Sequence, residues 1–421
     1  MVVAWALLHC AAVAAKATHS LFARFKETLV SLLLGAAVGV FGAGVSVAFL
    51  DTLNWADDFR VENASLIFAL PLAGLAIGLA YHFLGNSVIG GSNLVLEVIH
   101  EPGAGVPRRM APMVFISTFV SHLFGASTGR EGAGIQIVAS VTDTVARYFA
   151  PSTETRRLLL ITSIAAAFGG LFGVPIAGVV FALEVQETGR LRYDAILSAL
   201  VAALISFQLV EVAGLKHLVE GWLPQFEMSR ALSWQLMLLA VACATLARTF
   251  MWATHFVQTA SARFISWPPL RPVVGAIIIL GLVAVSGSRD YLGLSPQLAR
   301  EAFVGAAGIA AGAFVWKLLF TSISLGTGFV GGEMVPLFIV GALAGGQLAQ
   351  AFGASAPLFA AVGMVATFAA ASNTPIACII IGIELFGTGP IIPISIGCIL
   401  AYALSGHHSI YHAQRRVHVR H

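Results

Sequence analysis

The chain has 421 residues, of which 58% are hydrophobic and only 10% are charged. A soluble domain carries about 25% charged residues, so this composition excludes an ordinary soluble globular protein. The formal net charge of +3 is too small to indicate nucleic-acid binding.

The chain opens with the apolar run MVVAWALLHCAAVAAKA. This run is as apolar as a signal peptide but lacks the basic region that precedes a signal peptide's core. Because RFKETL follows soon after, the sequence favours a short N-terminal helix over a cleaved signal.

Apolar stretches of about 20 residues, long enough to span a bilayer, recur along the rest of the chain. They begin near Leu29, Leu66, Leu159, Ile196, Leu236, Val274, Ala306, Leu358 and Ile391. Basic residues lie in the connectors between them, and the tail carries Arg415, Arg416 and Arg420, which predicts a cytoplasmic C-terminus. The sequence therefore predicts an all-α integral membrane protein, with residues 1–421 as a single transmembrane domain and no soluble appendage.

The apolar sequence contains a repeat. AAFGGLFGVPIAGVVFALEV at 166–185 aligns without gaps with ATFAAASNTPIACIIIGIEL at 366–385, sharing PIA and a glutamate (Glu184 and Glu384). GREGAGIQIVAS at 129–140 aligns at nearly the same spacing with GGEMVPLFIVGA at 331–342. We expect two duplicated halves, roughly 28–215 and 231–414, that meet at a site near the membrane midplane. Chance similarity between membrane helices rich in small residues is the alternative.

Two glutamates stand at glycine-rich turns before apolar runs, Glu131 in GREG and Glu333 in GGEM. An interrupted helix is tolerated in the membrane only inside protein or beside a cavity, and its free N–H groups form an anion site. An ionised Glu131 would occupy this site in place of an anion, and a protonated one would release it and carry a proton. The alternative is that Glu131 only forms an ion pair with Arg130 that stabilises the turn.

Other polar residues are assigned structural roles. Glu184 and Glu384 are expected to cap or pair at helix ends rather than line an ion path. His407 and His408 are expected to lie at a helix end or the membrane interface rather than relay protons. Glu97 and His100 have no third ligand in the sequence, and the four cysteines are scattered, so no metal or other cofactor is predicted.

GREG with Gln136 downstream, the FGVPIAGVVFALEV stretch and the duplicated half together resemble the CLC family of chloride channels and anion/proton antiporters. The resemblance covers nearly the whole transmembrane part. It implies an all-helical homodimer in which each subunit has its own pore, built from two halves of opposite orientation with helices broken near the midplane. By residue-level correspondence it makes Glu131 the gating glutamate and assigns anion binding to Ser92, Gly132, Ala133, Met334 and Tyr411.

Three departures from the family pattern point to its fluoride-exporting branch. GSNLV replaces the usual GSGIP, so that Asn93 stands in place of a glycine and adds two N–H donors. GGEMV places Glu333 at the third motif, and Val185 replaces the internal glutamate of the chloride/proton exchangers. Val335, in contrast, stands where some members of that branch have threonine.

The sequence therefore predicts a fluoride/proton antiporter that exports fluoride in exchange for inward protons, with Glu131 and Glu333 in coupling and Asn93 among the anion ligands. The alternative is a chloride/proton antiporter or a passive chloride channel. An intramembrane enzyme, with Glu131 or Glu333 as acid or base, is disfavoured because the metal-binding motif HExxH does not occur. The expected partners are fluoride, protons, membrane lipid and a second copy of the chain, and the expected location is the bacterial inner membrane.

Overall fold

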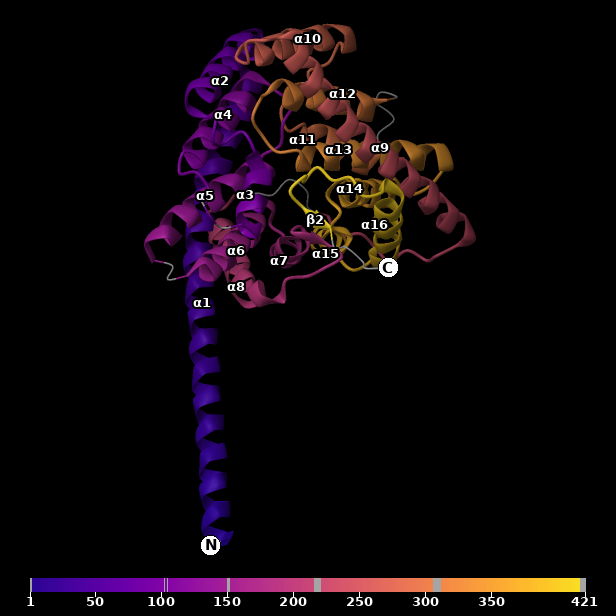
Figure 1. Cartoon of the computed structure of the whole chain (residues 1–421). Helices are drawn as coiled ribbons and strands as arrows, with labels where there is room; N and C mark the ends of the chain where they lie inside the picture. The colour runs from indigo at the N-terminus through magenta and orange to yellow at the C-terminus, as the bar shows by residue number, and fades with distance from the viewer. Residues whose placement is uncertain are drawn as a thin grey trace.

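The computed structural model describes residues 2–101, 103, 105–149, 152–215, 221–305 and 312–416, and of residues 2–27 the helical backbone alone. Most of the described chain is helical (Figure 1). The stretch predicted to begin near Ala306 starts outside the described residues, as does Arg420.

The first half of the chain contributes helices α1 to α8, with two 3-10 turns. Their bounds are α1 Val2–Glu62, η1 Ala64–Ala69, α2 Leu70–Leu84, α3 Gly91–His100, α4 Met110–Phe124, α5 Glu131–Phe149, α6 Thr153–Phe172, α7 Pro175–Glu184, η2 Tyr193–Ala195 and α8 Ile196–Val212.

The second half repeats this order of long, short and re-entrant helices in α9 to α16. Their bounds are α9 Arg230–Phe264, α10 Leu270–Ser286, α11 Pro296–Val304, α12 Ala313–Thr327, α13 Met334–Phe352, α14 Ala356–Ser372, α15 Pro375–Phe386 and α16 Ile391–Ser405. A short parallel pair of strands, β1 (Glu187–Thr188) and β2 (Arg415–Arg416), ties the end of the second half back to the first.

The N-terminal segment does not form a separate short helix. It is continuous with the first membrane span in α1. The physical reason is the absence of a helix breaker, since no proline or glycine occurs before Gly35.

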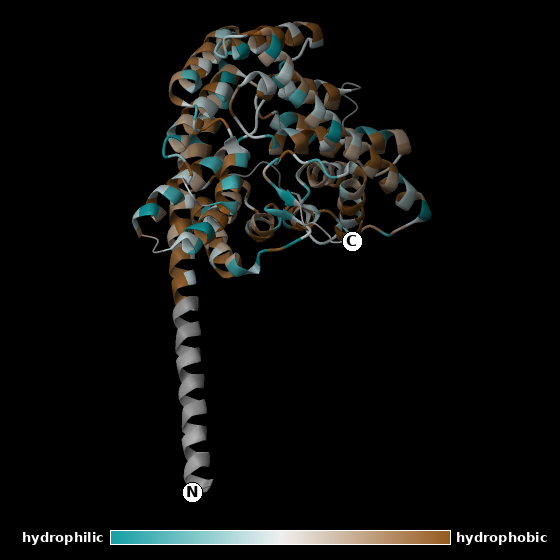
Figure 2. Ribbon diagram, in the orientation of Figure 1, coloured by the Kyte–Doolittle hydropathy of each residue, from teal (hydrophilic) through white to brown (hydrophobic). Residues whose placement is uncertain are grey.

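Six helices in the described part of the chain are long and apolar enough to cross a membrane: the Thr28–Glu62 part of α1, η1 with α2 (Ala64–Leu84), α6, η2 with α8 (Tyr193–Val212), α9 and α13. Hydrophobic residues cover most of the helical body (Figure 2). Several others, such as α7 with 10 residues and α15 with 12, are too short to span a bilayer at 1.5 Å per residue. The expectation of about 20 residues per apolar stretch is wrong for those beginning near Val274, Leu358 and Ile391. Their helices α10, α14 and α16 have 17, 17 and 15 residues, because proline, glycine or asparagine stands at their ends.

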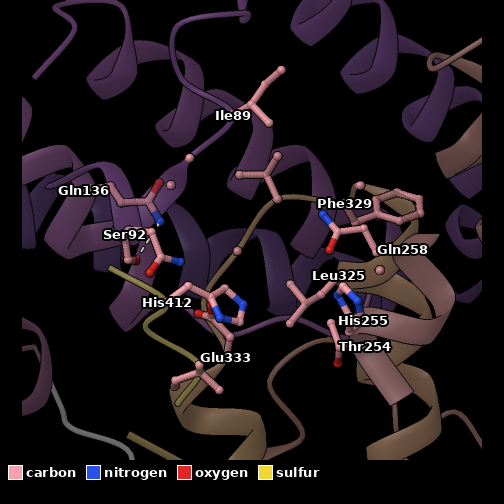
Figure 3. Close-up of a pocket in the computed structure, with 18 of the residues that line it drawn as sticks. Ile89, Ser92, Gln136, Thr254, His255, Gln258, Leu325, Phe329, Glu333 and His412 are labelled. Atoms are coloured by element: carbon pink, nitrogen blue, oxygen red, sulfur yellow. Dashed lines mark hydrogen bonds between the residues drawn. The ribbon is translucent and has the colours of Figure 1, made fainter. Parts of the chain in front are cut away.

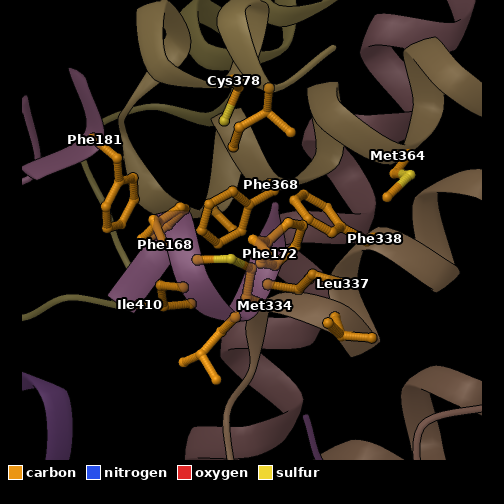
Figure 4. Close-up of a cluster of buried hydrophobic side chains, with 14 of the residues drawn as sticks. Phe168, Phe172, Phe181, Met334, Leu337, Phe338, Met364, Phe368, Cys378 and Ile410 are labelled. Carbon is orange, nitrogen blue, oxygen red and sulfur yellow. The ribbon is translucent and has the colours of Figure 1, made fainter. Parts of the chain in front are cut away.

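The core between the two halves is aromatic (Figure 4). Phe172 of α6 packs edge-on against Phe338 of α13, with ring centroids 5.3 Å apart, and Phe338 meets Phe368 of α14 at 5.2 Å. Phe181 of α7 lies 6.1 Å from Phe368. The Phe172–Phe338 and Phe181–Phe368 contacts cross the repeat boundary, so the two halves share one core.

Candidate functional site

The two glycine-glutamate motifs lie directly against each other. The backbone N–H of Gly129 donates to the Gly332 carbonyl at 2.7 Å, and the N–H of Gly332 donates to the Gly129 carbonyl at 2.7 Å. This antiparallel bridge places the starts of α5 and α13 side by side. Donors from both halves of the chain therefore converge at one point, as the repeat predicts.

Glycine is required for this close approach. A methyl group on Gly129 would lie 2.8 Å from the Gly332 carbonyl oxygen, and one on Gly332 would lie 2.6 Å from the amide nitrogen of Gly132. The Gly332 oxygen and the Gly132 nitrogen are backbone atoms, so neither can move aside as the end of a flexible side chain could. The methyl group added to Gly332 would also lie 3.6 Å from the amide nitrogen of Ala133, so the first N–H groups of α5 lie next to the bridge.

Glu131 is the first residue of α5 and is buried. Its carboxylate lies 3.2 Å from Nε of Arg130 and accepts a hydrogen bond from the backbone N–H of Arg130 at 3.2 Å. The Arg130 guanidinium also donates to Oδ1 of Asn54 on α1 at 3.2 Å. The ion pair weighed in the sequence analysis as the alternative is thus present, and the carboxylate lies at the start of its own helix.

Glu333 precedes α13 and makes no capping hydrogen bond to it through its side chain. It lies instead beside Gly132. A methyl group added to Gly132 would lie 3.3 Å from Oε2 of Glu333 and 3.8 Å from Oγ of Ser92. The carboxyl of one half and the hydroxyl of α3 therefore converge on the helix start of the other half.

A cavity of about 370 Å³ opens on this point (Figure 3). Its wall includes the end of α2, the start of α3, the middle of α9, the segment before α13 and the chain after α16. Among the lining residues are Ser92, Asn93, Gln136, His255, Glu333 and His412.

Two side-chain hydrogen bonds fix the polar groups of α3. Nε2 of Gln136 on α5 donates to Oγ of Ser92 at 3.1 Å. The side-chain oxygen of Asn93 accepts from the backbone N–H of Ala413 at 3.0 Å. Because the donor at Ala413 is a backbone amide, it fixes the oxygen side of the Asn93 amide, so the NH₂ group remains as the donor for a ligand.

Tyr411 is buried and lies near Ser92. Both residues line a small second cavity together with Val95, Phe181 and Val185. The Tyr411 ring lies 6.1 Å from that of Phe181, and the preceding residue is held by its N–H, which donates to the Ala371 carbonyl at 2.9 Å. Val185 is almost fully buried here, so this route past the tyrosine is apolar.

Met334 turns its side chain away from the site and into the aromatic core (Figure 4). Its backbone, as the first residue of α13, remains at the helix start. The predicted residues Ser92, Asn93, Gly132, Ala133, Glu333, Met334 and Tyr411 are thus gathered around two helix starts and one pair of cavities, and Glu131 lies at the same helix start with its carboxylate paired to Arg130.

Glu184 and Glu384 cap helices across the repeat boundary, which confirms the structural role predicted for them. The Glu384 carboxylate accepts from the N–H groups of Ile176 and Ala177 on α7, at 3.0 and 2.7 Å. The Glu184 carboxylate accepts from the N–H groups of Ile376 and Ala377 on α15, at 3.2 and 2.8 Å.

His407 and His408 follow α16 and are exposed. Neither lines the cavity that contains Glu333. Their position agrees with the helix-end role expected from the sequence.

Sequence analysis missed the buried charge of Lys317 on α12. Its ammonium group donates to Oγ of Ser127 at 3.0 Å, to Oγ of Ser295 at 2.8 Å and to the carbonyls of Gly293 at 2.7 Å and Tyr291 at 3.2 Å. These oxygens offset part of the cost of burying the charge, and they join the loop before GREG to the loop before α11. The sequence signal was a lone lysine inside AFVWKLLF.

Comparison with known proteins identifies the family of this chain. A model described as voltage gated chloride channel matches residues 73–406. The chain belongs to this CLC family. A chloride/fluoride channel protein of Pseudomonas syringae pv. tomato is 40% identical over 400 residues, covering 93% of this chain and 87% of the relative. An H⁺/Cl⁻ exchange transporter of Cronobacter sakazakii is 26% identical, covering 92% of this chain and 89% of the relative.

Solved CLC structures share the whole fold. A CLC-type fluoride/proton antiporter superposes with a TM-score of 0.88 at 30% identity, covering 92% of this chain and 98% of the other. A cyanobacterial Cl⁻/H⁺ antiporter superposes with a TM-score of 0.74 at 21% identity, covering 91% and 96%. The protein is therefore a multi-pass membrane protein with the CLC fold, as predicted, including its two halves of opposite orientation.

Proposed function

We propose that this protein is a fluoride/proton antiporter that exports fluoride from the cell in exchange for inward protons. The observation that carries the proposal is the meeting of Glu131 and Glu333 at bridged helix starts, with Asn93 on the wall of the same cavity. The printed names of a 40% identical relative and of the 0.88 TM-score neighbour support fluoride as the substrate.

The geometry supports a coupling step at Glu333. Its carboxyl lies beside Gly132 and Ser92, where an anion would also bind the helix start. Two negative charges a few ångströms apart repel strongly in a low-dielectric site, so fluoride enters when Glu333 is protonated or has moved. A protonated carboxyl offers an O–H donor to fluoride, so that proton and anion occupy the site together.

Glu131 supplies the second step. At the positive end of α5 its carboxylate substitutes for an anion, and protonation releases it from Arg130 and from the helix start. We propose Ser92, Asn93, Gly132, Ala133, Met334 and Tyr411 as the anion ligands between the two acids. A small, strongly hydrated anion requires several strong donors in place of its water, and the Asn93 NH₂ group adds to them.

The alternative is a chloride/proton antiporter or a passive chloride channel. Val185 opposes the first, because the internal acid of such exchangers is replaced by a buried apolar side chain. The retention of a gating acid, Glu131, opposes the second. We further propose a single transmembrane domain over residues 1–421, transport without enzymatic chemistry, a homodimer with one pore per subunit, and location in the bacterial inner membrane.

Anion selectivity in reconstituted liposomes tests the proposal. Vesicles loaded with fluoride or chloride are monitored with ion-selective electrodes, and proton uptake is followed with a pH-sensitive dye. We expect fluoride efflux to exceed chloride efflux greatly and to drive proton uptake. Chloride efflux with proton uptake would support the exchanger alternative, fluxes without proton movement would support a channel, and no anion flux would overturn the proposal.

A further inference from the structure

The proposed exchange needs a proton connection between Glu333 and the solution, and Val185 cannot provide it. Val185 is buried beside Phe181 in the small apolar cavity. A valine neither binds nor releases a proton, so the route taken by exchangers with an internal acid is closed here. The connection must use other groups that face Glu333.

The larger cavity contains such groups. The ionisable side chains on its wall are Tyr81 of α2, His255 of α9, Glu333 and His412. Glu333 is half-buried, whereas His412 is exposed. In Figure 3, His412 and Glu333 lie at the same end of the cavity, and His255 lies at the other end beside Thr254.

His412 is held on this wall by the chain on both sides of it. Asn93 accepts the N–H of Ala413 at 3.0 Å, and the Tyr411 N–H donates to Oγ of Ser409 at 3.1 Å. The N–H of Gln414 donates to the Tyr411 carbonyl at 3.0 Å. The imidazole therefore belongs to a turn that is tied to the anion site itself. The neighbouring Arg415–Glu101 ion pair is exposed, with a separation of 2.8 Å.

Imidazole is suited to this position. One ring nitrogen accepts a proton while the other donates, and imidazole exchanges protons readily near neutral pH. The cavity wall carries polar groups as well as apolar ones, and its volume of about 370 Å³ is large enough for water molecules to bridge short gaps.

We infer that His412 is the proton-transfer partner of Glu333, connecting that acid to the solution through the larger cavity. The Glu333 carboxyl gives its proton to an imidazole nitrogen, directly or through one water. The imidazolium then releases a proton to water in the cavity, and the imidazole returns to its neutral form. The inference rests on the proposed fluoride/proton exchange.

The test compares two histidines of one cavity. Purified wild-type, His412→Gln and His412→Ala proteins are reconstituted, with His255→Gln as the matched control from the opposite end. We expect His412→Gln to slow fluoride-driven proton uptake by at least about 100-fold, the lower end of the range for loss of a positioned proton-transfer group. Fluoride binding, measured by calorimetry on the same preparations, should remain, and His255→Gln should exchange at the wild-type rate.

Chemical rescue separates proton transfer from a structural role. Added imidazole should restore proton uptake in His412→Ala vesicles and leave wild-type vesicles unchanged. Wild-type exchange rates in His412→Gln would overturn the inference. Loss of fluoride binding together with exchange, without rescue by imidazole, would also overturn it, since His412 would then only support the site. A wild-type protein that does not exchange fluoride for protons would instead refute the proposed function.

Discussion

Two pairs of repeat-related glutamates have opposite surroundings. Glu184 and Glu384 exchange equivalent positions, since each caps the helix of the other half with two backbone hydrogen bonds. Glu131 and Glu333 do not. The first is paired with a buried arginine, and the second has no capping bond and faces a cavity.

This difference assigns a structural role to Glu184 and Glu384 and leaves Glu131 and Glu333 as the candidates for transport. Glu184 and Glu384 hold the two halves together by equivalent bonds, so this pair does not distinguish one side of the membrane from the other. An asymmetric pair gives the two acids different access and different partners, which a directional exchange requires. We therefore propose that Glu131 and Glu333, the pair whose environments differ, take part in moving the ion.

The largest effect is expected from Glu131→Gln. A neutral amide occupies the same volume but cannot titrate, so proton movement driven by a fluoride gradient should be abolished. Passive fluoride flux can persist, because the amide no longer holds a charge at the helix start. Proton uptake in liposomes measures this, and intact uptake would remove Glu131 from the mechanism.

Glu333→Gln should also damage exchange severely, since it removes the acid beside Gly132. Because the Glu333 side chain makes no capping hydrogen bond, we expect folding and dimerisation to be unaffected. Size-exclusion chromatography and fluoride-driven proton uptake are measured on one preparation. A monodisperse variant with unchanged exchange would contradict the asymmetry between the two pairs.

Asn93→Gly should weaken fluoride binding by roughly 10- to 150-fold, because a hydrogen bond to a charged group contributes about 1.5–3 kcal/mol. Calorimetric titration with fluoride measures the change. Asn93→Asp is the matched variant, since it keeps an oxygen for the Ala413 N–H and replaces the NH₂ donor by an acceptor. Wild-type affinity in Asn93→Asp would show that the amide is not a fluoride donor.

The smallest effect on transport is expected from Glu184→Gln and Glu384→Gln. A glutamine offers one acceptor oxygen where the carboxylate offers two, so one helix N–H loses its partner in each variant. An unsatisfied buried donor costs about 1–3 kcal/mol, which should appear as lower thermal stability in detergent. The proton-to-fluoride ratio of the surviving protein should be unchanged, and an altered ratio would place these residues on the ion path.

The sequence predicted the meeting of the two motifs because they occupy equivalent positions of the two repeated halves, and such halves meet at a shared site. It predicted the caps for the same reason. It offered the Arg130–Glu131 pair only as an alternative, because the arginine is positioned by Asn54, 76 residues away. The orientation of Asn93 was equally hidden, since it depends on an N–H 320 residues away. Lys317 was missed because the oxygens around its ammonium group come from loops without a repeat signal.

The exchanged caps of α7 and α15 also bear on ancestry. In a two-fold symmetric dimer, residue i of one copy contacts residue j of the other and the reverse contact follows automatically. Glu184 and Glu384 still obey this rule within one chain. An ancestor with a single half, inserted in the membrane in both directions, would have made the same two contacts between separate polypeptides. Fusion of two such halves would keep these contacts within one chain, where the two positions of every other pair are free to differ.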